Sequence, residues 1–278
     1  MIYLLSIIAV LIALILVFLP SMLHSLGLHP DYDGKNYAMN GKRALIVTTS
    51  HGILNKPGKT KGAKTGVFGS EMTIPYYEFQ DAGMEVDVAS IKGGEIPIDP
   101  QSFYYMMKSD ADKRYLKDKD FQAKVKNSLK IDDVDFTKYD AIMLAGGWGA
   151  AYDLGQSEEL GKKISEAYYA EKPIIGSVCH GALGLIQAKD KSGNLLIKGR
   201  DMTGVTNRQL QQLGVFFTPL HPEVELRKAG TNYKANSKAL DALATITVID
   251  QEKRFVTGQN QNSGHETAQK MMEIISSK

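Results

Sequence analysis

The residues best suited to covalent chemistry are Cys179 and His180, in the stretch Lys172 to Leu185, which reads K-P-I-I-G-S-V-C-H-G-A-L-G-L. An apolar, β-rich run over 173–178 stops at the cysteine, and small and apolar residues follow at once. This pattern predicts a strand, a sharp turn and a helix, with a nucleophile on the turn. Because free N–H groups at a helix start favour an anion, we expect a thiolate to form more easily at Cys179 than in water.

Cys179 is the only cysteine among 278 residues, so it forms no intrachain disulfide. A lone cysteine in an apolar run is commonly a small buried core residue and no nucleophile. The adjoining His180 and Gly181, placed where the strand pattern changes to a helix pattern, favour the catalytic interpretation.

The segments around this turn alternate between strand and helix patterns. Strands are predicted over 44–48, 84–89, 139–145 and 173–178, with helices over 65–82, 158–170 and 181–188. Between them, 50–63 reads as a loop and the charged stretch 101–130 as one or two solvated surface helices. Further strands are expected over 202–205, 244–249 and 254–257, and further helices over 208–213, 222–229 and 265–276. The alternation predicts an α/β fold with a mostly parallel sheet covered on both faces.

Ligands of such sheets bind beyond the carboxyl ends of the strands. His51 follows the first strand, Gly147 and Trp148 lie in the G-G-W-G loop after the third, and Cys179 follows the fourth. We therefore expect these residues to meet in one crevice.

The N-terminus has a different character. In residues 2–19 only Ser6 and the hydroxyl of Tyr3 are polar, and as a helix this run would span roughly 27 Å, close to the thickness of a bilayer's hydrocarbon core. A signal peptide is the alternative, but no basic residue precedes the run and no A-x-A site follows it. We expect a transmembrane anchor over 1–20 that ends at Pro20, a polar linker over 21–42 that includes Asp33, and a folded domain over 43–278.

The first basic residues, Lys35, Lys42 and Arg43, follow the apolar run, so the positive-inside rule places the domain in the cytoplasm. A reducing compartment also suits an unpaired cysteine.

Basic and acidic residues nearly cancel, 33 against 31, and nothing indicates a nucleic-acid partner. No histidine pair has metal-ligand spacing, and residues 56–64 lack the order of a phosphate-binding loop, so no metal and no cofactor is predicted.

Several motifs occur together in one order along the chain. They are T-G-V-F over 65–68 followed by Glu71, A-G-G over 145–147, V-C-H-G over 178–181, T-G over 203–204 and V-T-G-Q-N over 256–260. In this respect the chain resembles the ThiJ/PfpI superfamily, which is type 1 glutamine amidotransferase-like, and within it the branch of glyoxalase III and heat-shock chaperone proteins. The resemblance runs from about Lys42 to the C-terminus. It implies a flavodoxin-like three-layer sandwich and, as is common among relatives, a homodimer.

The resemblance also implies roles. Cys179 would be the nucleophile, Glu71 the general acid and base, and His180 a proton carrier, in a lyase of the D-lactate dehydratase type that converts methylglyoxal to D-lactate without glutathione. Backbone N–H groups near Gly147 and Gly181 would stabilise the oxyanion. Glu71 beside Cys179 places two acids in one partly dry site, so one of them keeps its proton.

Two features depart from the family pattern. Relatives carry an acidic partner for the histidine after the Thr-Gly strand, whereas this chain has amides, with Gln209 and Gln211 as the candidate third members. An amide orients an imidazole but does not stabilise its charge. Trp148 replaces a small residue or a histidine, and either walls the pocket or packs on the surface.

Two other functions stay open at this point. One is a non-enzymatic stress chaperone or a redox sensor in which Cys179 is oxidised. The other is a glutamine amidotransferase, because His221 and Glu223 imitate the distant His and Glu of those enzymes. Leu183 stands where the glutamine-binding pattern G-x-C-x-G-x-Q requires glutamine, which argues against that reading.

Overall fold

The computed structural model describes residues 2–32 and 34–278, so Met1 of the predicted anchor and Asp33 of the predicted linker lie outside the described residues. The described residues form a seven-stranded sheet in the order β10-β11-β7-β6-β1-β4-β5. Its neighbouring strands are parallel, except for the antiparallel pair β10 and β11. The strands are β1 (Arg43–Thr48), β4 (Glu85–Ser90), β5 (Leu129–Lys130), β6 (Ala141–Leu144), β7 (Ile174–Val178), β10 (Thr247–Ile249) and β11 (Phe255–Gly258).

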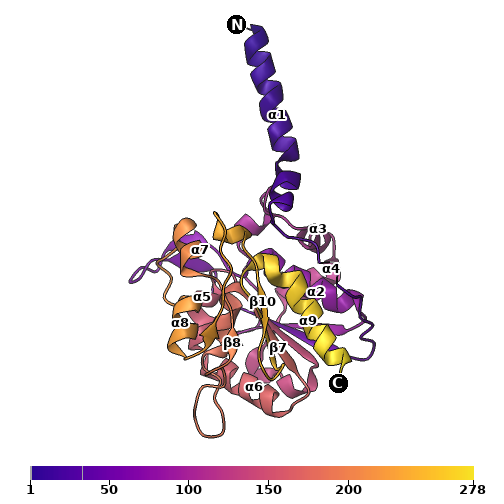
Figure 1. Ribbon diagram of the computed structural model, residues 1–278, viewed down its shortest axis with the longest axis vertical. Coiled ribbons are helices and arrows are strands. Elements are labelled where there is room, and N and C mark those ends of the chain that lie inside the picture. The colour runs from indigo at the N-terminus through magenta and orange to yellow at the C-terminus, as the bar shows by residue number, and fades with distance from the viewer. Residues whose placement is uncertain (1, 33) are drawn as a thin grey trace.

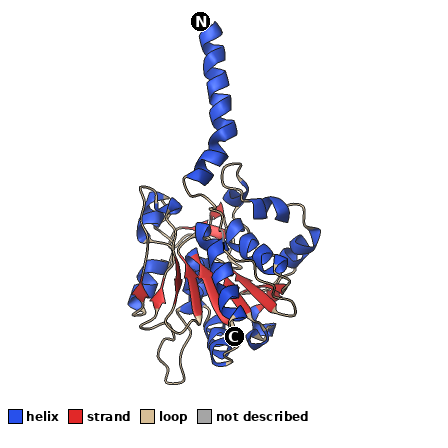
Figure 2. Ribbon diagram, turned by 45° about the vertical axis from the view of Figure 1, so that its right-hand side comes forward, coloured by secondary structure: helices blue, strands red, loops and turns tan. Residues whose placement is uncertain are grey.

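Helices cover both faces of this sheet (Figure 2). Successive side chains of a strand point to opposite faces, and in β1 Ile46 belongs to one buried cluster whereas Val47 belongs to the other. The first cluster is completed by α2 (Gly69–Asp81), α3 (Asp110–Tyr115), α4 (Lys119–Lys126) and α9 (Gly264–Ser276). The second is completed by α5 (Ala150–Asp153), α6 (Glu158–Tyr169) and α8 (Pro222–Lys228). The prediction of an α/β fold with a mostly parallel sheet is confirmed.

Two small pairs of strands lie outside the main sheet. An antiparallel hairpin joins β2 (Ile53–Asn55) and β3 (Gly62–Lys64), where a loop was expected. The strand expected over 202–205 is the two-residue strand β8 (Asp201–Met202), which pairs with β9 (Asn232–Tyr233). Helix α7 (Asn207–Gln212) follows β8 in the chain.

The stretch 101–130 is less solvated than its charge pattern predicted. Phe121 of α4 is fully buried and stacks on Tyr76 of α2 with ring centroids 3.5 Å apart. Asp112 of α3 is buried as well and accepts hydrogen bonds from Thr73 and Ser109. The apolar residues between the charges therefore cover one edge of the core, and Leu129–Lys130 extends the sheet as β5.

The N-terminal helix α1 (Ile2–Ser25) continues past Pro20, contrary to the expected end there (Figure 1). In the turn after Ser25, Gly27 has a φ of +110°, which suits glycine and lets Leu28 N–H reach Leu23 O. Tyr3–Ser25 has a mean hydropathy of 2.9 and its most apolar stretch is not buried by the domain, so it is long and apolar enough to span a membrane, a property that signal sequences share. The linker is partly packed on the domain, because Leu28 and Met39 are buried.

Candidate active site

Cys179 lies on the turn that ends β7. Its backbone has a φ of +57°, a left-handed conformation that is unfavourable for a residue with a side chain and typical of nucleophile elbows. The segment that follows, η5 (Cys179–Leu185), is a 3-10 helix, where an α-helix over 181–188 was expected. Gly181 and Gly184 lower the α-helix propensity of this segment. They also let it lie directly on β6, because a methyl group added at Gly181 would be 2.1 Å from Leu144 O.

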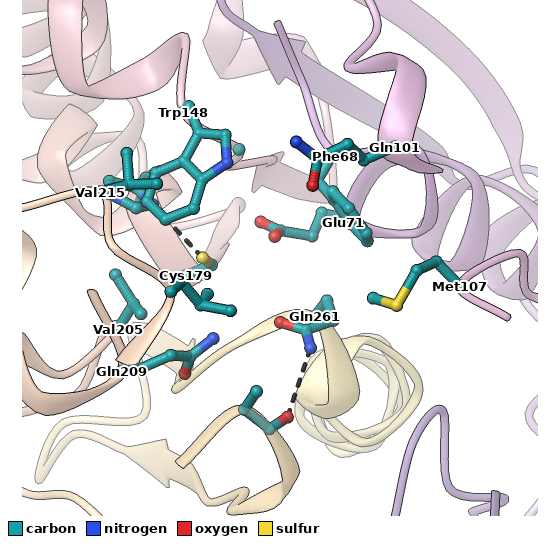
Figure 3. Close-up of a pocket in the computed structure, with 14 residues that line it drawn as sticks. Phe68, Glu71, Gln101, Met107, Trp148, Cys179, Val205, Gln209, Val215 and Gln261 are labelled. Carbon is teal, nitrogen blue, oxygen red and sulfur yellow. Dashed lines mark hydrogen bonds between the residues drawn. The ribbon is translucent and has the colours of Figure 1, made fainter. Parts of the chain in front are cut away.

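Glu71 comes from the first turn of α2 and reaches the same point (Figure 3). Glu71 is 2% exposed as a residue, and its carboxyl group hydrogen-bonds the Cys179 side chain and accepts from Gly146 N–H at 3.1 Å. A methyl group added at Gly146 would lie 2.5 Å from Glu71 Oε2, so only glycine lets the loop approach the carboxyl group this closely. The loop after β6 and the start of α2 therefore hold Glu71 against the sulfur.

Burial shifts the acidity of both groups. It raises the pKa of Glu71 from 4.5 to about 8, against the effect of its hydrogen bonds with Cys179, Gly146 and Gly147. Burial and the adjacent Glu71 carboxyl also raise the pKa of the Cys179 thiol, whereas the N–H groups of His180 and Gly147 act in the opposite direction. The expectation of a thiol more acidic than in water is wrong, because burial outweighs these N–H groups. The two acids are coupled, and at neutral pH Glu71 is the protonated donor to the sulfur.

His180 is fully enclosed beside the cysteine. Its Nδ1 lies 3.4 Å from Cys179 Sγ, and Trp148 contacts its ring edge-on at 5.2 Å between centroids. Burial, with a smaller effect from His221, lowers the pKa of His180 to about 3, so the imidazole is neutral. Its Nε2 has no hydrogen-bond partner among the described residues.

A model of the DJ-1/PfpI family matches residues 63–274. The chain belongs to the DJ-1/PfpI family. It is 30% identical over 237 residues to glyoxalase 3 of Candida albicans, a match that covers 82% of this chain and 95% of that protein. It is 29% identical over 248 residues to the glutathione-independent glyoxalase HSP31 of Saccharomyces cerevisiae, covering 85% and 99% of the two chains.

Solved structures agree with this assignment. The Rapid Encystment Protein of 24 kDa from Francisella tularensis superposes with a TM-score of 0.76 at 32% identity, over 84% of this chain and 99% of that one. Glyoxalase III from Candida albicans superposes with a TM-score of 0.72 at 28% identity, over 85% and 96%. Each of these two structures is matched over nearly its whole length. About 15% of the residues of the present chain lie outside the match.

In this DJ-1/PfpI chain, Cys179, His180 and Glu71 open into a cavity of about 160 Å³. Gly147 and Trp148 line it, so Trp148 walls the pocket instead of packing on the outer surface. Much of the remaining wall is apolar, from Phe68, Met107, Val205, Leu213 and Val215. Gln101, Gln209 and Gln261 supply polar groups. Met107, Gln101 and Gln261 were not predicted, because their neighbours in sequence carry no chemical pattern.

His51 does not take part in this cavity. Its ring stacks on Tyr152 at 4.2 Å between centroids, and its Nε2 lies 2.6 Å from Ile53 O. The hairpin that replaces the expected loop holds it there. The prediction that His51 joins Cys179 in one crevice is therefore wrong.

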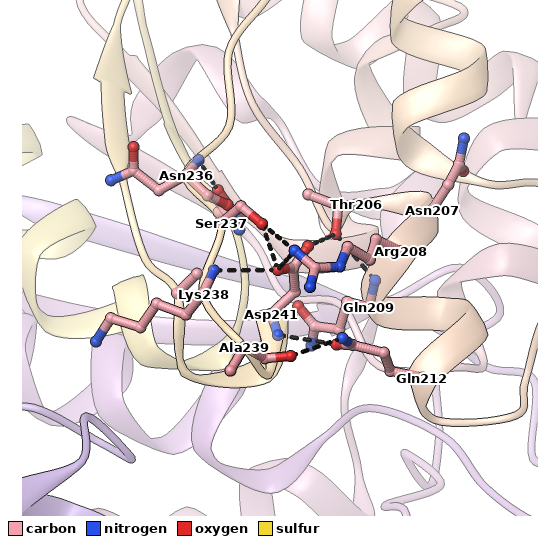
Figure 4. A network of polar contacts seen from close by, with 12 residues as sticks. Thr206, Asn207, Arg208, Gln209, Gln212, Asn236, Ser237, Lys238, Ala239 and Asp241 are labelled. Atoms are coloured by element: carbon pink, nitrogen blue, oxygen red, sulfur yellow. Dashed lines mark hydrogen bonds and ion pairs between the residues drawn. The ribbon is translucent and has the colours of Figure 1, made fainter.

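Neither proposed third member reaches His180 Nε2. Gln209 lines the cavity, but its Oε1 accepts from Asn260 Nδ2 at 3.1 Å, and Gln211 is exposed on α7. The acid that α7 does meet comes from a distant loop (Figure 4): buried Asp241 accepts from Thr206 Oγ1 at 3.0 Å and from Ser237 Oγ at 2.9 Å. This network attaches α7 to residues 236–243 and so fixes two walls of the cavity, a role that no local pattern around Asp241 indicated.

Proposed function

We propose that this protein is a glutathione-independent enzyme of the glyoxalase III type, which converts a 2-oxoaldehyde to a 2-hydroxy acid. The observation that carries the proposal is the buried contact between the Glu71 carboxyl group and Cys179 on a strained turn at the floor of a small cavity. Relatives named as glutathione-independent glyoxalases or as glyoxalase 3, at 25–30% identity, support the same reaction class.

The proposed reaction begins when the Cys179 sulfur adds to the aldehyde carbon and forms a hemithioacetal. Backbone N–H groups of Gly147 and of the elbow at Gly181 would stabilise the oxygen that gains charge. Glu71 removes the proton from the former aldehyde carbon and returns a proton to the neighbouring carbon, which yields a thioester of the 2-hydroxy acid. Water then cleaves the C–S bond and restores the thiol, so the sum is R-CO-CHO plus H₂O to R-CHOH-COOH.

Proton transfer is assigned mainly to Glu71. A histidine without an acidic partner and with a pKa of about 3 stays neutral, so His180 accepts no lasting charge. In this proposal His180 orients the sulfur and relays a proton within the cavity. Glu71, with a pKa of about 8, exchanges protons close to neutral pH.

The test is the formation of D-lactate from methylglyoxal by wild type, Cys179→Ser and Glu71→Gln. We expect turnover to fall by at least ~10³-fold in Cys179→Ser and by about 10²-fold or more in Glu71→Gln, because these changes remove the nucleophile and the general base. Equal turnover in all three proteins would refute the enzymatic proposal.

A redox sensor is the second candidate, and the unpartnered Nε2 of His180 is the observation that favours it. In this case Cys179 would be oxidised without turnover of a carbonyl. Titration with peroxide followed by intact mass would report a sulfinate on wild type and none on Cys179→Ser. Formation of D-lactate at a steady rate would exclude this candidate as the main function.

We also propose that α1 is a retained single-span anchor and that the domain over 43–278 lies on the cytoplasmic side. The exposed apolar surface of the helix and the basic residues after it support this. Detection of the mature N-terminus at Met1 or Ile2 in the membrane fraction would support a retained anchor, whereas a mature chain that begins after residue 25 would refute it.

A further inference from the structure

Six exposed apolar side chains belong to the chain segments that line the active-site cavity. These six residues, termed the rim, are Tyr104, Tyr105, Met106, Leu213, Phe216 and Leu240, each between 42% and 64% exposed. Leu213 is itself a lining residue, and each of the others lies within three positions of a lining residue, namely Met107, Val215 or Ala242. A soluble enzyme for small polar aldehydes has no need of such a rim, and clustered exposed apolar residues mark contact with another apolar surface.

The chain that leaves α1 contacts residues next to this rim. His29 N–H donates to Asn262 Oδ1 at 2.8 Å, and His29 Nε2 lies 2.8 Å from Met107 O. A methyl group added at Gly27 would be 3.2 Å from both Leu243 O and Lys238 Nζ. Leu28, between Gly27 and His29, is buried.

These contacts place the end of α1 beside the cavity. Met107 lines the cavity, and Asn262 and Leu243 adjoin the lining residues Gln261 and Ala242. In Figure 1 α1 leaves the domain near α3, with α7 on the same upper side and α6 on the opposite side of the domain. A bilayer that contains α1 would therefore meet the rim first.

We propose that the rim rests on the lipid bilayer and that the cavity admits a reactive carbonyl whose alkyl chain partitions into that bilayer. This inference rests on the proposed function and on α1 being an anchor. The 160 Å³ cavity holds the 2-oxoaldehyde head, and its apolar wall accepts the first carbons of the chain. Tyrosines are typical of the membrane interface, and Lys108 and Lys238 beside the rim suit lipid phosphates. The bond changes are those of the proposed reaction, with an alkyl group as R.

Tryptophan quenching tests the membrane contact without any need for activity. Trp148 is the only tryptophan, so Trp148→Phe gives a dark full-length background. Tyr105→Trp in that background, in nanodiscs that contain a nitroxide on the upper acyl chain, should lose at least about half of its emission, because interfacial side chains lie within ~5–10 Å of that depth. Tyr169→Trp is the matched control, since Tyr169 is 41% exposed at the end of α6, next to the amino edge of the sheet. Equal quenching at the two positions would overturn the proposal.

Substrate preference tests the second half of the proposal. In nanodiscs, Tyr104→Ser, Tyr105→Ser and Met106→Ser together should lower kcat/KM for 2-oxododecanal about tenfold, since apolar contact at the mouth is lost, and leave kcat/KM for methylglyoxal within about twofold. The matched control replaces three exposed apolar residues that do not line the cavity, Leu116, Tyr169 and Val224, by serine. Equal losses for the two aldehydes, or no loss for the long one, would overturn the proposal. If wild type turned over neither aldehyde while the tryptophan at position 105 was quenched, the proposed function would be refuted. The membrane-facing rim would still be supported by the quenching.

Discussion

Replacing Glu71 by glutamine should make the protein more stable while it removes the proposed base. The folded state raises the pKa of Glu71 from 4.5 to about 8, so it binds a proton that the unfolded chain has released between these pH values. A carboxyl group whose pKa is raised by folding destabilises the folded state progressively as the pH rises from 4.5 to 8. Below pH 4.5 the group is protonated in both states and has no such effect. Glutamine has the same shape, donates to Cys179, accepts from Gly146 N–H and does not ionise.

The magnitude follows from the two pKa values. At about 1.4 kcal/mol for each tenfold change, the wild type loses about 1 kcal/mol of unfolding free energy at pH 5, about 3 kcal/mol at pH 7 and about 4 kcal/mol at pH 8, relative to a group that never ionises. We therefore expect the free energy of unfolding of Glu71→Gln to exceed that of wild type by roughly these amounts.

Urea denaturation at pH 5, 7 and 8 measures the difference directly. Glu95→Gln is the matched control, because it makes the same substitution at an exposed carboxylate that does not line the cavity. A difference that stays constant across the three pH values, or a variant less stable than wild type at pH 8, would refute the argument that burial controls the ionisation of Glu71. A gain in stability would also show that loss of turnover in Glu71→Gln is not due to misfolding.

Two further predictions concern the same turn. The value of kcat/KM for methylglyoxal should rise about tenfold per pH unit between pH 6 and 8 and then level off, because the Glu71 and Cys179 pair must lose one proton before the sulfur attacks; a flat profile would contradict this. Gly181→Ala should lower the free energy of unfolding by about 3 kcal/mol or more, because its methyl group would overlap Leu144 O, whereas Gly193→Ala has open space and should cost only about 1 kcal/mol for its φ of +84°. Similar urea midpoints for the two alanine variants would show that the close approach at Gly181 is not required.

Local patterns were sufficient for the scaffold and for the central residues of the site. A buried parallel strand reads as a continuous apolar run, and the runs that became β1, β6 and β7 needed no tertiary information to be found. The elbow was visible because a cysteine, a histidine and a glycine follow such a run directly. Glu71 was identified only by family resemblance, since a lone glutamate on a helix otherwise reads as a solvated residue.

Tertiary packing decided which groups surround the sulfur and how acidic they are. His51 follows a strand just as Cys179 does, yet a hairpin turns it onto Tyr152, whereas Met107 and Gln261 enter the cavity from segments without a chemical pattern. The pKa of Glu71 depends on how completely the loop at Gly146 and the elbow exclude water from its carboxyl group, and so does the neutral state of His180. Sequence determines which functional groups are available along the chain. Their protonation depends on solvent exclusion and on neighbours from distant segments, and only the assembled fold provides these.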